Sequence, residues 1–223
     1  MENKFNESIS EENGLKIINC DHSRILSVGV STGGIAEIRM IEKNPNAYVI
    51  ATTIDEKGLE FSKDIIIEKG FEDRIELRIE DVSKPIPYSD EYFDFIYARL
   101  VLHYLDRNQL KNALKELRRV LRNNGNIYIV VRSTRDVAVS LPDSVYYPEN
   151  GMTKHADYRT IGTSNVKYVY RSFYSEESIR EYLEEAGFSI EYVKEYEEQL
   201  YSDYERKELA LKPAHLLEVL ARK

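Results

Sequence analysis

Residues 24–37 read Arg-Ile-Leu-Ser-Val-Gly-Val-Ser-Thr-Gly-Gly-Ile-Ala-Glu, and this stretch decides the fold. A short apolar run ends in small residues, and apolar residues then return at helical spacing as Ile35, Ile38 and Ile41. This pattern predicts a strand, a tight turn and a helix. Glycine allows positive φ and close approach of the backbone, and the first turn of a helix offers free N–H groups to a polar or anionic ligand. The stretch therefore indicates a turn that holds a nucleotide-like cofactor.

The turn departs from the dinucleotide-binding pattern G-x-G-x-x-G. Residues 29–34 read Gly-Val-Ser-Thr-Gly-Gly, so Ser31 stands where that pattern has its second glycine. Turns of small residues also occur for purely structural reasons in α/β folds. The identity of the ligand therefore depends on the rest of the chain.

Strand and helix patterns alternate after the first helix. This alternation predicts an α/β domain with a parallel sheet and right-handed crossovers. Asp106 and Gln109 form a plausible capping box for one helix, which we expect to end at Asn124-Gly125. The strands are expected at 46–53, 74–79, 92–98, 127–131, 188–194 and 214–221, and the other helices before residue 22, at 56–69 and at 175–186.

Residues 133–173 interrupt the alternation, with several prolines, glycines and tyrosines and no clear periodicity. A long stretch of this kind inside a compact domain is usually a functional lid or a binding loop. We expect residues 1–223 to form a single domain in which 133–173 is a lid or a substrate-binding insertion.

Composition excludes several classes of function. The chain has 223 residues, 42% of them hydrophobic and 31% charged, and no apolar run reaches the roughly 20 residues of a membrane span. A formal net charge of −8 disfavours a nucleic-acid substrate, because a phosphate-binding surface carries clustered Lys and Arg. The single Cys20 and the absence of a secretory pattern at the N-terminus predict a cytoplasmic protein.

Together these stretches resemble the class I S-adenosylmethionine-dependent methyltransferases, in particular the small-molecule methyltransferases. The resemblance covers residues 24–132 well and continues through a late helix, Glu-Ala-Gly-Phe and a terminal strand. Its most specific motifs are Glu-Asp-Val at 80–82 with Pro-Ile-Pro-Tyr at 85–88, Tyr-Phe-Asp-Phe-Ile at 92–96, Leu-His-Tyr-Leu at 102–105 and Glu-Leu-Arg-Arg-Val-Leu at 116–121.

The resemblance implies a Rossmann-like fold: a seven-stranded, mostly parallel sheet with helices on both faces and an antiparallel last strand. It implies S-adenosyl-L-methionine as cofactor, S-adenosyl-L-homocysteine as product and no metal. Gly29 and Gly33 would let the backbone approach the methionine part, while Asp81 would accept a hydrogen bond from the adenine amino group and Val82 would pack on the ring. The expected cofactor-binding residues are Gly29, Val30, Ser31, Gly33, Thr53, Ile54, Asp55, Asp81, Val82 and Arg99.

The chain departs from the family pattern at both cofactor motifs. Ser27 stands where the family usually has an acidic residue, two before the first glycine, and Ser31 stands where it has glycine. The carboxylate that grips the ribose hydroxyls normally ends the second strand, where this chain has Thr53. Asp55, two residues later, either substitutes for that carboxylate or caps the following helix, and the sequence leaves both readings open.

His103 is the candidate general base. It follows the fourth strand at the rim where ligands bind in such sheets, and an imidazole with a pKa near ~6.5 suits removal of a proton from the nucleophile. The alternative for this position is a packing or substrate-contact residue. Arg99 and Tyr104 are further expected contacts of the substrate.

Three functions remain open from the sequence. The first is a methyltransferase acting on a small molecule through an O, N or C nucleophile. The second is a degenerate cofactor-binding domain that serves as a regulatory or partner subunit, suggested by the departures at Ser27, Ser31 and Thr53. The third is a methyltransferase of RNA or protein, which the acidic balance disfavours. The methyl acceptor and the oligomeric state do not follow from the sequence.

Overall fold

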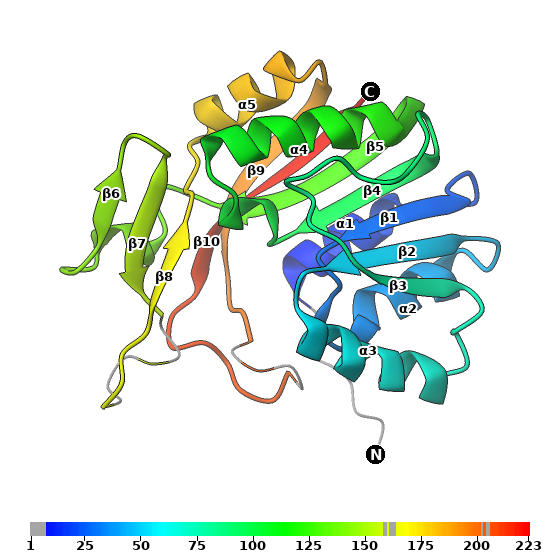
Figure 1. The fold of residues 1–223 in the computed structure, drawn as a ribbon, viewed down its shortest axis with the longest axis horizontal. Helices are drawn as coiled ribbons and strands as arrows, with labels where there is room; N and C mark the ends of the chain where they lie inside the picture. The colour runs from blue at the N-terminus through cyan, green and yellow to red at the C-terminus, as the bar shows by residue number, and fades with distance from the viewer. Residues whose placement is uncertain (1–7, 158–159, 161–163, 202, 204–205) are drawn as a thin grey trace.

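A seven-stranded sheet forms the centre of the molecule. The computed structural model describes residues 8–157, 160, 164–201, 203 and 206–223. The strand order is β3-β2-β1-β4-β5-β10-β9, and β10 alone runs antiparallel to both of its neighbours (Figure 1). The strands are β1 (Arg24–Val28), β2 (Tyr48–Thr53), β3 (Ile75–Ile79), β4 (Phe93–Arg99), β5 (Leu121–Arg132), β9 (Ser189–Glu198) and β10 (Ala214–Arg222). This confirms the predicted α/β class and the antiparallel last strand.

Helices cover both faces of the sheet because the central strands are apolar on both sides. Ile25 of β1 and Phe95 of β4 pack in one core cluster toward α1 (Ile9–Ile17), α2 (Ile35–Lys43) and α3 (Glu56–Glu68). Leu26 and Ile96, the next residues along these strands, pack in the other cluster toward α4 (Arg107–Val120) and α5 (Glu176–Glu185) (Figure 1). No helix in the described ranges is both long and apolar enough to cross a membrane.

The predicted helix starts are confirmed by their caps. Asp106 and Gln109 form the expected capping box of α4, and Asp55 caps α3. The predicted end of α4 is wrong: the helix stops at Val120, and Leu121 already pairs with Phe93 in the sheet. The reason is tertiary, since the ammonium of the terminal Lys223 donates to the Leu121 carbonyl at 2.8 Å and helps to fix this segment as strand.

The insertion at 133–173 contains regular structure that the sequence pattern did not predict. Three short strands, β6 (Val145–Tyr147), β7 (Met152–Ala156) and β8 (Tyr168–Arg171), form an antiparallel sheet that stands beside the main sheet (Figure 1). Strands this short do not produce a clear alternation of apolar and polar residues. The backbone N–H of Ser172, just after β8, donates to the His103 carbonyl at 2.8 Å and ties the insertion to the segment after β4.

Candidate active site

A cavity of about 500 Å³ lies at the carboxyl ends of β1, β2, β3 and β4. Ligands bind at this edge in open α/β sheets, where the strand order reverses. The structure brings together all but one of the predicted cofactor-binding residues in the lining of this cavity: Gly29, Val30, Ser31, Thr53, Ile54, Asp55, Asp81, Val82 and Arg99.

Gly33 is the exception, because it lies outside this lining. Its φ is +67°, and a Cβ atom there would lie 2.9 Å from the Ile65 side chain of α3. Gly33 is therefore needed for the backbone conformation and for packing against α3. Gly29 does line the cavity. Its φ is +79°, and a Cβ atom there would lie only 3.0 Å from the Val101 side chain.

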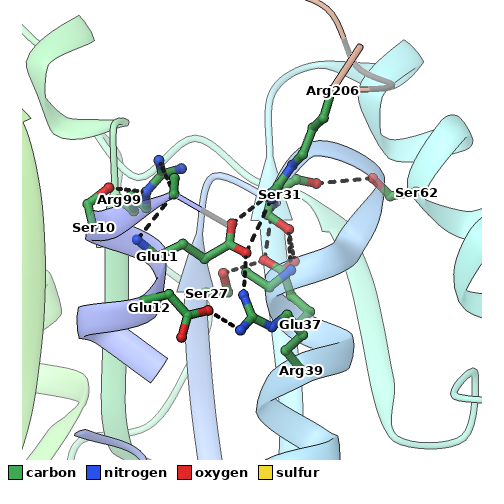
Figure 2. Close-up of polar contacts among 12 residues, drawn as sticks. Ser10, Glu11, Glu12, Ser27, Ser31, Glu37, Arg39, Ser62, Arg99 and Arg206 are labelled. Carbon is green, nitrogen blue, oxygen red and sulfur yellow. Dashed lines mark hydrogen bonds and ion pairs between the residues drawn. The ribbon is translucent and has the colours of Figure 1, made fainter. Parts of the chain in front are cut away.

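The turn after β1 is closed by a carboxylate from α2. Figure 2 shows Glu37 pointing back toward Ser27 and Ser31. Glu37 Oε1 accepts hydrogen bonds from Ser27 Oγ at 2.6 Å and from the Ser31 backbone N–H at 3.1 Å, and Oε2 accepts a short one from Ser31 Oγ. Glu37 and Ser27 are both fully buried. A carboxylate thus contacts Ser27, the position where the family pattern has an acidic residue of its own.

The backbone donors of this turn are largely engaged within the protein. Gly29 N and Val30 N donate to the Thr52 carbonyl at 2.8 Å, and Ala36 N donates to Ser31 Oγ at 2.9 Å. Of the donors in the first helical turn, which the sequence predicts to be free for a ligand, the Ala36 N–H is engaged within the protein.

The segment after β2 shows the capping role of Asp55. Asp55 Oδ1 accepts the Lys57 backbone N–H at 3.1 Å, while Thr53 Oγ1 accepts the Asp55 N–H at 3.0 Å. Ile54 between them is 74% exposed and lines the cavity. A large apolar side chain in this position offers a surface for a flat ring.

Two adjacent carboxylates follow β3, and the sequence reasoning missed one of them. Asp81 Oδ1 accepts from the Ser83 hydroxyl at 2.7 Å and from its N–H at 3.0 Å, and these bonds lower the pKa of Asp81. Glu80 also lines the cavity, and its Oε1 accepts the Tyr88 hydroxyl at 2.7 Å. Glu80 Oε2 is buried and accepts no hydrogen bond from the described residues. The clue to Glu80 in the sequence was its position directly before Asp81.

A second cavity of about 210 Å³ adjoins the first. The two share the lining residues Thr32, Arg99, Leu100 and Tyr104. Arg99 comes from the end of β4, where its guanidinium donates to Ser10 Oγ at 2.6 Å and to Glu198 at 3.1 Å (Figure 2 shows the Ser10 contact). Arg99 is thus held rigidly at the junction of the two cavities.

His103 lines the second cavity, on the short helix η2 (Leu102–Tyr104). It is 2% exposed, and its Nδ1 has no hydrogen-bond partner among the described residues. Burial, with the charges of Arg171, Arg132 and His155, holds the pKa of His103 well below its usual value. The imidazole is therefore neutral near pH 7, the state in which it can accept a proton.

The other three histidines lie outside both linings. His22 stacks on Phe95, and His155 Nδ1 lies 2.9 Å from the Ala156 carbonyl. His215 is on β10, with Glu195 and Glu197 3.7 Å from its ring nitrogens. These three histidines therefore contribute no side chain to either cavity.

Comparison with known proteins agrees with this geometry. Residues 26–129 match the family model of a methyltransferase domain. A solved S-adenosylmethionine-dependent methyltransferase of Methanosarcina mazei superposes with a TM-score of 0.71 and 16% identity, over 94% of this chain and 96% of that chain. Residues 26–129 are thus similar in sequence to a methyltransferase domain. At 16% identity the structural likeness shows the fold, and the family match extends from β1 into β5.

Two curated relatives are methyltransferases. Methyltransferase GfsG of Streptomyces halstedii is 32% identical over 117 residues, which are 51% of this chain and 40% of that protein. The ubiquinone/menaquinone biosynthesis C-methyltransferase UbiE of Cupriavidus taiwanensis is 28% identical over 107 residues, which are 48% of this chain and 42% of that protein. The match thus spans less than half the length of each relative.

The solved protein of Methanosarcina mazei is named for its dependence on S-adenosylmethionine, and the residues of the larger cavity in this chain fit that cofactor. A volume of about 500 Å³ lies within the usual range of small-molecule sites. Ile54 and Val82 supply apolar surface for the adenine ring. The carboxylates of Asp55, Glu80 and Asp81 supply acceptors for amino and hydroxyl donors, and the buried Glu80 Oε2 still has capacity to accept one.

Proposed function

We propose that this chain transfers the methyl group of S-adenosylmethionine to a small-molecule acceptor through an O, N or C nucleophile. The observation that carries the proposal is the pair of adjoining cavities, which share Arg99 and Tyr104 at their junction. The larger would hold the cofactor and the smaller the acceptor. The UbiE relative is named a C-methyltransferase of quinone biosynthesis, which supports a small-molecule acceptor. The free thiol of Cys20 suits the cytoplasm that we propose as its location.

In this proposal the cofactor supplies a methyl group already activated by its sulfonium, and the chain supplies alignment. Asp81 would accept the adenine amino group, with Ile54 and Val82 on the faces of the ring. Asp55 and Glu80, which also line the larger cavity, are our candidates for binding the ribose hydroxyls, because Thr53 stands where the family has a carboxylate. Arg99 would face the methionine end of the cofactor and the acceptor.

His103 is our candidate for the base that accepts the proton of the nucleophile. Its location in the smaller cavity and its neutral state support this role. In the transfer, the bond from sulfur to methyl breaks as the bond from methyl to nucleophile forms, and S-adenosylhomocysteine leaves. The lowered pKa makes His103 a weak base, which suits a nucleophile that is itself fairly acidic.

The two other candidate functions differ in what they require of the site. A degenerate partner subunit is favoured by the turn after β1, where Glu37 and Thr52 engage donors that a ligand could have used. An RNA methyltransferase requires a basic mouth, yet Asp55, Glu80 and Asp81 line the larger cavity beside the single arginine of its lining.

Calorimetric titration of the purified protein with S-adenosylmethionine and with S-adenosylhomocysteine tests the proposal. We expect micromolar binding of both compounds, no binding of NAD, and loss of at least about tenfold in affinity in Asp81→Ala, because one charge-assisted hydrogen bond is removed. Asp90→Ala, at an exposed carboxylate outside both cavities, is the matched control. If neither compound binds, the degenerate partner subunit is favoured.

A further inference from the structure

The smaller cavity is unusually rich in arginine. Burying a cation is costly unless an anion neutralises it, so each buried arginine should have a carboxylate beside it. Three of the four arginines in the described lining do: Arg99 lies 3.1 Å from Glu198, Arg132 lies 2.7 Å from Asp136 and Arg206 lies 2.6 Å from Glu11.

Arg171 is the fourth, and it has no such partner. It ends β8 and is only 7% exposed. Within the part of the chain that the structure describes, no carboxylate lies within ion-pair distance of its guanidinium. Its Nη2 lies 3.3 Å from the Tyr104 hydroxyl, and its Nε is enclosed without a hydrogen-bond partner. The Tyr104 hydroxyl satisfies one donor, and its ring faces the guanidinium with the centroid 5.3 Å from Cζ, but the phenol supplies no negative charge.

The groups around Arg171 do not supply the missing charge. His103 is neutral near pH 7, and Arg132 nearby is another cation. Asp157 also lines the cavity, but it lies beyond 4.0 Å from the guanidinium of Arg171. Of the charged groups here, Arg171 is therefore the one poised to take an anion from outside the protein.

We propose that the methyl acceptor carries a carboxylate and that Arg171 binds it, which rests on the methyl-transfer function proposed above. A guanidinium fork matches a carboxylate in shape and in charge. One uncompensated arginine matches a monoanion better than it matches a doubly charged phosphate. Arg171 belongs to the insertion and Tyr104 to the rim shared with the larger cavity, so the acceptor would lie between these two parts.

The test is calorimetric binding of acetate, lactate and benzoate to the protein saturated with S-adenosylhomocysteine. Each acid is compared with its primary amide, which has a similar shape and no charge, and phenyl phosphate is compared with benzoate. We expect at least one acid to bind about 10- to 100-fold more tightly than its amide, and benzoate more tightly than phenyl phosphate. Arg171→Gln should remove the preference for the acid, and Arg171→Lys should retain part of it.

Arg180→Gln is the matched control, because Arg180 pairs with Glu176 on the surface of α5. Binding of S-adenosylhomocysteine is measured on every variant, so that a folded cofactor site is verified separately. The carboxylate inference is overturned if S-adenosylhomocysteine binds but no acid is preferred over its amide. It is also overturned if Arg171→Gln keeps the preference for the acid. In both cases the methyl-transfer proposal stands. Tighter binding of phenyl phosphate would replace the carboxylate by a phosphate. Failure of S-adenosylhomocysteine to bind the unaltered protein would overturn both.

Discussion

Glu37 accepts hydrogen bonds from two serine hydroxyls and one backbone N–H in the turn after β1, all within a buried site. Glu37→Ala would leave the fully buried Ser27 hydroxyl without this acceptor. We expect the free energy of unfolding to fall by about 1–3 kcal/mol, the usual cost of an unsatisfied buried polar group. The affinity for S-adenosylhomocysteine should fall as well, because Glu37 fixes the shape of the turn that carries Val30 and Ser31.

Urea denaturation and calorimetry measure these two effects. Glu42→Ala removes the same charge from an exposed position of the same helix and should change neither quantity. A double variant that combines Ser27→Asp and Glu37→Ser would move the carboxylate from the helix to the strand. It should restore part of the affinity for S-adenosylhomocysteine that is lost in Glu37→Ala. Unchanged stability in Glu37→Ala would show that Glu37 does not support the turn.

At the residue scale, the sequence predicts which positions surround the cofactor cavity better than what each one does. Gly29 and Asp81 stand where the motif places them, because strand ends in a parallel sheet meet at one edge. Glu37 was not predicted, since its contact with Ser27 crosses from helix to strand and depends on side-chain direction. The clue in the sequence was that Glu37 lies between Ile35 and Ile38, two apolar positions of a helix that must be buried against the sheet.

At the scale of elements, α1 is joined to the segment between β9 and β10 by a buried ion pair. Figure 2 shows Arg206 reaching Glu11, with Nη1 and Nη2 at 3.2 and 2.6 Å from the carboxylate oxygens. The Glu11 side chain is fully buried and that of Arg206 is 5% exposed. Arg206 lines the smaller cavity and adopts a φ of 55°, so this pair holds Arg206 in an otherwise unfavourable backbone conformation.

We predict that Glu11→Gln accelerates tryptic cleavage after Arg206 by about tenfold or more, because the buried guanidinium loses its counter-charge and leaves its site. Cleavage is followed by mass spectrometry under native conditions. Glu12→Gln is the control, since Glu12 pairs with Arg39 and is partly exposed. Equal cleavage rates in the two variants would show that Glu11 does not hold this segment.

The sequence predicts the long elements of this molecule and misses the short or context-dependent ones. Capping residues such as Asp106 act on their own chain neighbours, so they can be read locally. The end of α4 at Val120 depends on pairing with β4 and on the distant Lys223. The strands β6, β7 and β8 form through pairing with one another, and their short sequences carry little periodicity of their own.

At the scale of the whole molecule, alternation of strands and helices was enough to predict the class and the sheet, because parallel strands require crossover helices. The charge of the acceptor could not be predicted, since Arg171 is distinguished from the other arginines only by the carboxylates that the fold places beside them. Whether Glu80 contacts the cofactor depends in the same way on which of its oxygens the fold leaves unpaired.

The buried histidines give the whole fold a predictable dependence on pH. Burial lowers the pKa of His22, His103 and His155, which are 7%, 2% and 0% exposed. In the unfolded chain their pKa is about 6.5, so below this pH the unfolded state binds more protons than the folded state. The free energy of unfolding should therefore be highest above about pH 7 and should decrease as the pH falls below ~6.5.

Urea denaturation at pH 7.5 and pH 5.5 measures this decrease. Burial holds the pKa of His103 well below 6.5 in the folded state, so it should account for up to about 1.4 kcal/mol of this decrease, the value for a group that is protonated only in the unfolded chain. His103→Gln should reduce the difference between the two pH values by about this amount, whatever its effect on stability at pH 7.5. His215→Gln is the control, since His215 lies beside Glu195 and Glu197 and is less buried. If His103→Gln shows the same decrease as the unaltered protein, the imidazole is protonated in the folded state and cannot be the neutral base of the acceptor cavity.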